Sequence, residues 1–242
     1  MKLRGTAVVA GTAVAAGTVL THALPAITSI APLRRAVWPN LAGRGDTGHI
    51  ALTFDDGPDP AYTPGLLNIL DRAGVTATFF LLGSMLAEHP TIGREIAAAG
   101  HEIALHGWDH RLLLRRMPAS TRDDLARGRD LIEEVTGVRV HWWRPPYGVL
   151  TTSSLAAARD LGLTPILWSA WGRDWTGTAT GDSVLSTVER GLRPGGTVLL
   201  HDSDCTSVPG SSRATMQAAP VLISRLRARG LSVGPLREHG VA

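Results

Sequence analysis

The hydrophobic residues of this 242-residue chain fall into short apolar runs that alternate with amphipathic segments from His49 onward. The short runs are typical of buried strands, and the segments between them carry leucines at helical spacing, as in Leu66, Leu67 and Leu70. We expect strands at 50–52, 76–82, 102–105, 140–143, 164–168, 197–200 and 231–233, and helices at 63–74, 91–99, 120–134, 152–161, 182–192 and 214–229. This alternation predicts an α/β fold with about seven parallel strands, arranged as a barrel.

The pattern before residue 48 is different. A short basic start, Lys2 and Arg4, precedes a long uncharged stretch that is rich in Ala, Val, Gly and Thr over residues 6–20. This arrangement predicts that residues 1–30 are a signal peptide or a membrane anchor. Residues 31–47 contain Pro, Gly and Arg and are expected to be a linker. Both alternatives place the remaining chain outside the cytoplasm, either secreted or held at the membrane by the N-terminal segment alone.

Polar clusters follow the predicted strands almost directly. In a parallel barrel the carboxyl ends of the strands share one face, and active sites are assembled there from several strand ends. We therefore expect the five clusters to form one site. They are Asp55–Asp56, His106–His110, Arg144–Tyr147, Asp174–Trp175 and His201–Asp202.

The first two clusters have the composition of a metal site. Two adjacent carboxylates disfavour each other's ionisation, and a bound cation removes that penalty. One aspartate can then ligate the metal while its neighbour acts as a base. His106 and His110 are spaced four apart, so on a helical turn they would share one face and could bind one ion. Together with Asp56 they would form a two-histidine, one-carboxylate site suited to zinc, cobalt, nickel or iron.

The other clusters offer a general acid and a segment that can bind negatively charged oxygen atoms. His201 leaves the strand at 197–200, and a histidine opposite a carboxylate base can protonate a leaving amine. A fourth metal ligand or a packed core histidine are the alternatives at this position. Arg144 can pair with a carboxylate, and the backbone N–H of Tyr147 can face an oxyanion. A plain Pro-Pro loop is the alternative there.

Composition narrows the class of protein. The chain is 44% hydrophobic and 19% charged, as globular domains are, and its net charge of +3 is not gathered on one basic face. We therefore expect no nucleic-acid partner, and we expect a monomer. Cys205 is the single cysteine, so an intrachain disulfide and a cysteine-based zinc site are excluded. We do not expect Cys205 to be a nucleophile, because a metal site already supplies one.

Five motifs in this order resemble those of the NodB-type polysaccharide deacetylases, carbohydrate esterase family 4. The resemblance runs from about residue 48 to the C-terminus and implies that 48–242 is a NodB homology domain with a deformed (β/α) barrel. It also implies metal-dependent removal of N-acetyl or O-acetyl groups from carbohydrate. The matching segments are Thr53–Pro58, His106–His110, Arg144–Tyr147, Asp174–Trp175 and Leu199–Asp202.

The resemblance also implies roles for individual residues. Asp55 would be the general base and Arg144 would orient it. His201 would be the general acid, positioned by Asp174. A divalent metal, zinc in the first instance, would be bound by Asp56, His106 and His110.

The pocket residues and two departures complete this comparison. The Tyr147 amide would help to hold the oxyanion, and Trp175 and Leu199 would line the pocket for the acetyl methyl group. Family members usually have Ser or Thr where this chain has Gly107, which removes a hydroxyl that could brace the ligand loop. They usually have Asp where this chain has Trp171, and an indole there would alter which sugar ring binds.

We therefore expect a hydrolase of carbon–nitrogen bonds other than peptide bonds, acting on an N-acetylglucosamine-containing polymer such as peptidoglycan or a chitin-type oligosaccharide. Two alternatives stay open from the sequence. The first is a catalytically silent carbohydrate-binding protein that keeps the fold and the metal. The second is a deacylase of a non-carbohydrate amide.

Overall fold

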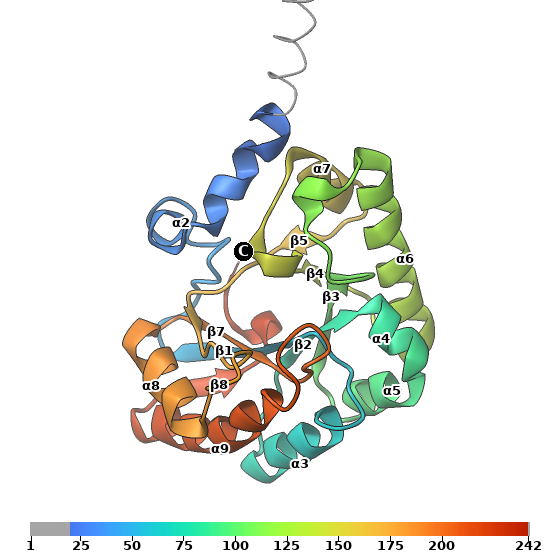
Figure 1. Cartoon of the computed structure of the whole chain (residues 1–242). Coiled ribbons are helices and arrows are strands. Elements are labelled where there is room, and N and C mark those ends of the chain that lie inside the picture. The colour runs from blue at the N-terminus through green and yellow to red at the C-terminus, as the bar shows by residue number, and fades with distance from the viewer. Residues whose placement is uncertain (1–19, 242) are drawn as a thin grey trace, which may run out of the picture.

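The computed structural model describes residues 20–241, and a single curled sheet of parallel strands forms its centre (Figure 1). Within these residues the strands run in the order β5-β4-β3-β2-β1-β7-β6, and β8 pairs in parallel with the first residues of β1. This half-barrel confirms the predicted deformed barrel of about seven parallel strands. The strands are β1 (His49–Asp55), β2 (Thr78–Leu82), β3 (Glu102–Gly107), β4 (Trp142–Trp143), β5 (Thr164–Pro165), β6 (Ala170–Trp171), β7 (Thr197–His201) and β8 (Ser232–Gly234).

Helices follow the strands along the chain and cover the outside of the curled sheet (Figure 1). The α-helices are α2 (Ala31–Val37), α3 (Thr63–Ala73), α4 (Gly83–Glu88), α5 (Pro90–Ala98), α6 (Pro118–Thr136), α7 (Thr152–Asp160), α8 (Gly181–Gly191) and α9 (Ser212–Ala228). The short 3₁₀ helices are η1 (Leu24–Ser29), η2 (Leu113–Arg115), η3 (Pro146–Gly148) and η4 (Leu236–Glu238).

Alternation along β1 sends its side chains to the two faces of the sheet. Ile50, Leu52 and Phe54 belong to the large apolar cluster that the sheet shares with the helices, whereas Ala51 belongs to a smaller cluster on the other face. Because successive residues of a strand point to opposite faces, Thr53 and Asp55 share the face of Ala51. The interior of the half-barrel therefore receives the carboxylate at the end of β1.

The sheet edges differ from the sequence expectation. The expected strand 164–168 pairs with β4 only at Thr164 and Pro165, and the separate short strand β6 then pairs with β7. Residues 166–169 cross from the β5 edge of the sheet to the β6 edge. Within them the Leu167 N–H donates to the carbonyl oxygen of Leu41, outside the sheet, at 2.8 Å. A helix that we did not expect, α4, begins at Gly83 directly after β2.

Residues 31–47, expected to be a linker, instead contain α2 and pack into the opening between β5 and β6. The buried Arg34 guanidinium donates to the carbonyl oxygens of Thr28 at 2.8 Å and Trp168 at 3.0 Å. The physical reason is that the backbone at the edge of an open sheet needs hydrogen-bond partners, and Arg34 supplies donors there. Most of the predicted signal peptide or anchor at 1–30 lies outside the described residues. Within residues 20–241, no helix is both long and apolar enough to cross a membrane.

Candidate active site

Three side chains that could ligate a metal converge where β1 and β3 end. Asp56 Oδ1 lies 3.3 Å from His106 Nε2 and 3.6 Å from His110 Nε2, and one ligand atom from each residue lies within 4.8 Å of the others. Asp56 has a left-handed backbone (φ 78°), an uncommon conformation for a non-glycine residue that collects at functional sites. Its buried Oδ1 has no hydrogen-bond partner in the described chain. The donor set and this unpartnered oxygen fit a divalent cation.

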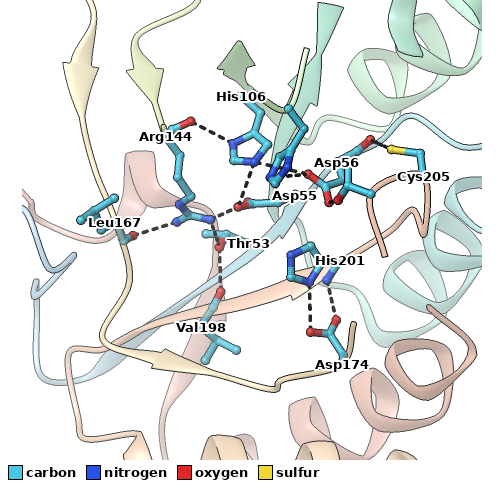
Figure 2. Close-up of polar contacts among 12 residues, drawn as sticks. Thr53, Asp55, Asp56, His106, Arg144, Leu167, Asp174, Val198, His201 and Cys205 are labelled. Atoms are coloured by element: carbon cyan, nitrogen blue, oxygen red, sulfur yellow. Dashed lines mark hydrogen bonds and ion pairs between the residues drawn. The ribbon is translucent and has the colours of Figure 1, made fainter. Parts of the chain in front are cut away.

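Neighbouring groups orient the ligands. His106 Nδ1 lies 2.8 Å from the carbonyl oxygen of Arg144 and therefore donates to it, which leaves Nε2 with its lone pair toward Asp56 (Figure 2). Thr206 Oγ1 donates to Asp56 Oδ2 at 2.6 Å. The ring of His110 packs edge-on against Tyr147, with 4.4 Å between ring centres.

The protonation states suit metal binding. Burial by itself would raise the pKa of Asp56, but the adjacent His106 and the nearby positive charge of His201 hold that pKa well below its usual range. Burial lowers the pKa of His110 to about 4. At neutral pH the site therefore presents a carboxylate and a neutral imidazole, which are the forms that bind metal.

The loop that carries His110 is fastened to α6. Asp124 on α6 accepts a hydrogen bond from the Trp108 backbone N–H at 3.1 Å and pairs with Arg116 at 2.9 Å. Arg116 in turn pairs with Asp109, directly beside His110. Gly107 has φ 108° and a Cβ there would lie 3.2 Å from Asp124 Oδ2, so the glycine leaves room for this carboxylate. Asp124 thus braces the loop where the sequence lacks a hydroxyl.

The second aspartate of the pair, Asp55, is held by a buried arginine. Arg144 Nη1 lies 2.6 Å from Asp55 Oδ1 and also donates to Thr53 Oγ1 at 2.8 Å (Figure 2). Arg144 Nη2 donates to the carbonyl oxygen of Leu167 at 2.9 Å. Burial lowers the pKa of Arg144, and the adjacent Asp55 charge opposes that shift. The other carboxylate oxygen, Asp55 Oδ2, lies 3.9 Å from His106 Nε2 and so faces the metal-ligand set.

A histidine–aspartate pair occupies the end of β7. His201 Nδ1 donates to Asp174 Oδ1 at 3.0 Å, and Asp174 Oδ2 accepts from the His201 backbone N–H at 2.7 Å and from Thr215 Oγ1 at 2.6 Å. Burial alone would lower the pKa of His201, but the Asp174 carboxylate outweighs it and raises that pKa to about 10. His201 is therefore a cation at neutral pH, with Nε2 available as a proton donor.

These groups surround one cavity of about 230 Å³. Its apolar side includes Leu199 and Trp175, and a row of indoles continues outward: Trp171 contacts Trp175 with ring centres 5.0 Å apart. Trp171 is exposed at the mouth, so the indole at this departure from the family pattern forms part of the cavity wall. The lining is Asp55, Asp56, His106, His110, Pro145, Tyr147, Gly148, Trp168, Trp171, Trp175, Leu199, His201, Thr206 and Ser207.

The structure brings the sequence-predicted site residues together, and eight of the ten line the cavity. The other two lie behind the lining, where Arg144 bonds to Asp55 and Asp174 bonds to His201. Sequence reasoning missed four supporting residues that lie outside the five motifs: Asp124, Trp168, Thr206 and Thr215. Thr53 opens the first motif, but its bond to Arg144 was not predicted. Cys205 is exposed overall, but its thiol turns toward the Asp56 carbonyl oxygen, and shielding from water together with the nearby carboxylates raises the pKa of the thiol to about 11. The thiol is therefore protonated at neutral pH.

Comparisons with known proteins agree with this geometry. Residues 42–166 match the family model described as polysaccharide deacetylase, so the chain belongs to the polysaccharide deacetylase family. A chitooligosaccharide deacetylase of Bradyrhizobium sp. (strain ANU 289) is 36% identical, over 88% of this chain and 99% of that protein.

Two solved structures share the fold. A peptidoglycan N-acetylglucosamine deacetylase in complex with 4-naphthalen-1-yl-N-oxidanyl-benzamide superposes with a TM-score of 0.78 at 27% identity, over 86% of this chain and 96% of that one. A CE4 family pseudoenzyme from Bacillus anthracis superposes with a TM-score of 0.71 at 28% identity, over 79% of this chain and 64% of that one. The resemblance stated from the sequence is confirmed, and the fold occurs in an enzyme and in a pseudoenzyme.

Proposed function

We propose that this chain is a metal-dependent hydrolase that removes acetyl groups from an N-acetylglucosamine-containing polysaccharide, with peptidoglycan or a chitin-type oligosaccharide as the substrate class. The observation that carries the proposal is the placement of Asp55 and His201 around the triad of Asp56, His106 and His110 in one cavity. Family membership and the named activities of the relatives support the same reaction. The bond cleaved is an amide carbon–nitrogen bond, or an ester bond for O-acetyl substrates.

Asp56, His106 and His110 would hold a divalent metal, for which we propose zinc. When bound, such a metal would polarise the acetyl carbonyl and lower the pKa of a water molecule, so that a nucleophile is available at neutral pH. The orientation of His106 by the Arg144 carbonyl and of Asp56 by Thr206 keeps the three ligand atoms in place.

Asp55 is the proposed general base. Its Oδ2 accepts a proton from the attacking water. Arg144 holds the other oxygen of the Asp55 carboxylate, and Thr53 in turn accepts a hydrogen bond from Arg144, so both side chains are fixed in a buried position. Arg144 also fixes the direction of the Asp55 carboxylate through a charge-assisted hydrogen bond. The 3.9 Å approach of Asp55 Oδ2 to His106 Nε2 supports a base beside the proposed metal site.

His201 is the proposed general acid. Its Nε2 gives a proton to the departing sugar nitrogen, and Asp174 fixes the ring through Nδ1 and keeps the imidazole protonated until that step. The Tyr147 backbone amide is the proposed donor to the oxyanion, and its left-handed conformation (φ 59°) sets the direction of the adjoining peptide groups. Trp175 and Leu199 would receive the acetyl methyl group.

The domain division and location follow from the same proposal. Residues 48–242 carry the catalytic machinery, with 31–47 packed against it, and residues 1–30 would direct the chain out of the cytoplasm as a signal peptide or membrane anchor. An extracytoplasmic location agrees with a cell-wall or chitin-type polymer as substrate. We also propose that the protein is a monomer.

Acetate release by the full chain tests the proposal. The protein would be treated with a chelator, dialysed, and then assayed on N-acetylglucosamine oligomers and on peptidoglycan before and after addition of zinc or cobalt. We expect release that disappears with the chelator and returns with metal. Absence of release from both substrates in a metal-loaded sample would overturn the proposal and favour a silent carbohydrate-binding protein. A pseudoenzyme among the structural neighbours makes this control necessary.

A further inference from the structure

Exposed large apolar side chains concentrate at the N-terminal end of the described chain. Of the thirteen such residues among residues 20–241, six lie between residues 20 and 38. Scattered exposed apolar residues are ordinary, but a concentration of this kind marks an interaction surface. We call these six residues the apolar face: Leu20, Leu24, Ile27, Ile30, Val37 and Trp38.

A large cavity adjoins the apolar face. Leu24, Ile27 and Trp38 border a space of about 470 Å³, whose remaining wall includes Trp142 from β4 and Leu155 from α7. The lining side chains are predominantly hydrocarbon and aromatic. The face therefore extends as an apolar surface from the N-terminal helices onto the barrel, far larger than a single exposed side chain.

The apolar face belongs to a folded part of the molecule. Arg34, between its two halves, is bonded to Thr28 and to Trp168 of the barrel, and Thr152 Oγ1 donates to the carbonyl oxygen of Thr21 at 2.7 Å. The blue N-terminal segment that contains η1 and α2 stands at one end of the molecule (Figure 1), and η1 packs against η3, which carries Tyr147. The face is thus held in a fixed position beside the rim of the active site.

We propose that the apolar face lies in the surface of an anionic lipid bilayer and holds the catalytic domain against the membrane. Two observations select this occupant. Leu20, the first residue of the apolar face, is also the last residue of the uncharged run over residues 6–20 that resembles a membrane-targeting segment. Within residues 20–45 the accessible charged side chains, Arg35 and Arg44, are both basic, which suits an anionic surface, while exposed Trp and aliphatic side chains suit its interface. The proposal rests on the anchor alternative of the proposed function, in which residues 1–30 stay attached to the catalytic domain.

Trp38 provides a probe for this contact. It is the only one of the seven tryptophans that precedes residue 108, and it is 38% exposed, whereas Trp171 at the active-site mouth is 39% exposed. The full chain would be incorporated into vesicles of phosphatidylethanolamine and phosphatidylglycerol with brominated acyl chains, which quench indoles at the bilayer surface. We expect quenching in the natural chain, its loss in Trp38→Phe, and its persistence in the matched control Trp171→Phe.

A second variant tests the face without removing the probe. Ile27→Asp places a charge in the face, and we expect it to weaken the quenching of Trp38 while acetate release from a soluble oligosaccharide is unchanged. Flotation with the vesicles but no quenching would overturn the apolar face as a membrane contact and leave the anchor standing. Failure to float would overturn both. A dimer in lipid-free solution that Ile27→Asp converts to a monomer would identify a second copy as the occupant and overturn the proposal. Acetate release from the soluble substrate reports the proposed function separately from all these outcomes.

Discussion

The Asp124 carboxylate on α6 accepts a hydrogen bond from the backbone N–H of Trp108, two residues before the metal-ligating His110. The two residues are sixteen positions apart in sequence, and the bond is 3.1 Å long. Because Asp124 also pairs with Arg116, which reaches Asp109, one buried carboxylate fastens both sides of the ligand loop. The loop therefore has a support that compensates for the missing hydroxyl at Gly107.

This relationship predicts a loss of metal affinity in Asp124→Asn. The amide can still accept one bond but no longer carries the charge that pairs with Arg116, so the loop becomes less well held. Residues that orient metal ligands typically contribute about 10–100-fold to metal affinity. Competition with a chromophoric zinc chelator would measure this, with the exposed neighbour Asp123→Asn as the matched control. Equal affinities in the two variants would show that the bond does not support the site.

Asp55→Asn should abolish most of the activity and leave the metal bound. The variant keeps the shape of the side chain but removes the base, and general acid–base groups contribute roughly 10²–10⁴-fold to rate. The ratio of zinc to protein, measured by atomic absorption, should stay at the value of the natural chain because the ligands are Asp56, His106 and His110. Retention of full turnover would transfer the role of base to another group.

The His201–Asp174 pair predicts the alkaline limit of the activity. His201 must be protonated to act as an acid, and Asp174 raises its pKa against the opposing effect of burial. In Asp174→Asn the raising charge is lost while burial remains, so the pKa of His201 falls and the proton is lost at lower pH. We expect the alkaline limb of the kcat/KM profile of the metal-loaded enzyme to move to lower pH in Asp174→Asn. An unmoved limb together with a lower plateau would indicate that Asp174 only positions the ring.

Arg34→Ala should destabilise the fold, because the buried Arg34 guanidinium links the N-terminal helices to the barrel. The substitution leaves the carbonyl oxygens of Thr28 and Trp168 without their donor in a buried environment. An unsatisfied buried polar group costs about 1–3 kcal/mol in the free energy of unfolding. Urea unfolding would measure the change, and Arg35→Ala is the control because its one bond to the fold, to Ser169, is long at 3.4 Å. Equal stabilities would mean that the hydrogen bonds of Arg34 do not stabilise the folded unit.

Much of the catalytic arrangement was predictable because it depends on local patterns. The alternation along β1 determines that Thr53 and Asp55 enter the interior, and the order of apolar runs determines that the strands are parallel. Once the strands are parallel, polar residues after their carboxyl ends must meet on one rim. This is why Asp56, His106 and His201 could be assigned to one site without coordinates.

Other features were decided only by tertiary structure. Arg34 meets Trp168 across 134 positions of sequence, and Thr206 meets Asp56 across 150. Hydrophobic periodicity reports which face of an element is buried but not which distant polar atoms it is buried against. Asp124 shows the same limit: on an amphipathic helix it reads as one more polar residue, and only the packing of α6 on the ligand loop makes it a support. The sequence by itself thus determined most of the strands and helices and the rim on which the site residues meet. The contacts that close the half-barrel and brace the proposed metal ligands arise from packing between segments with no local signal.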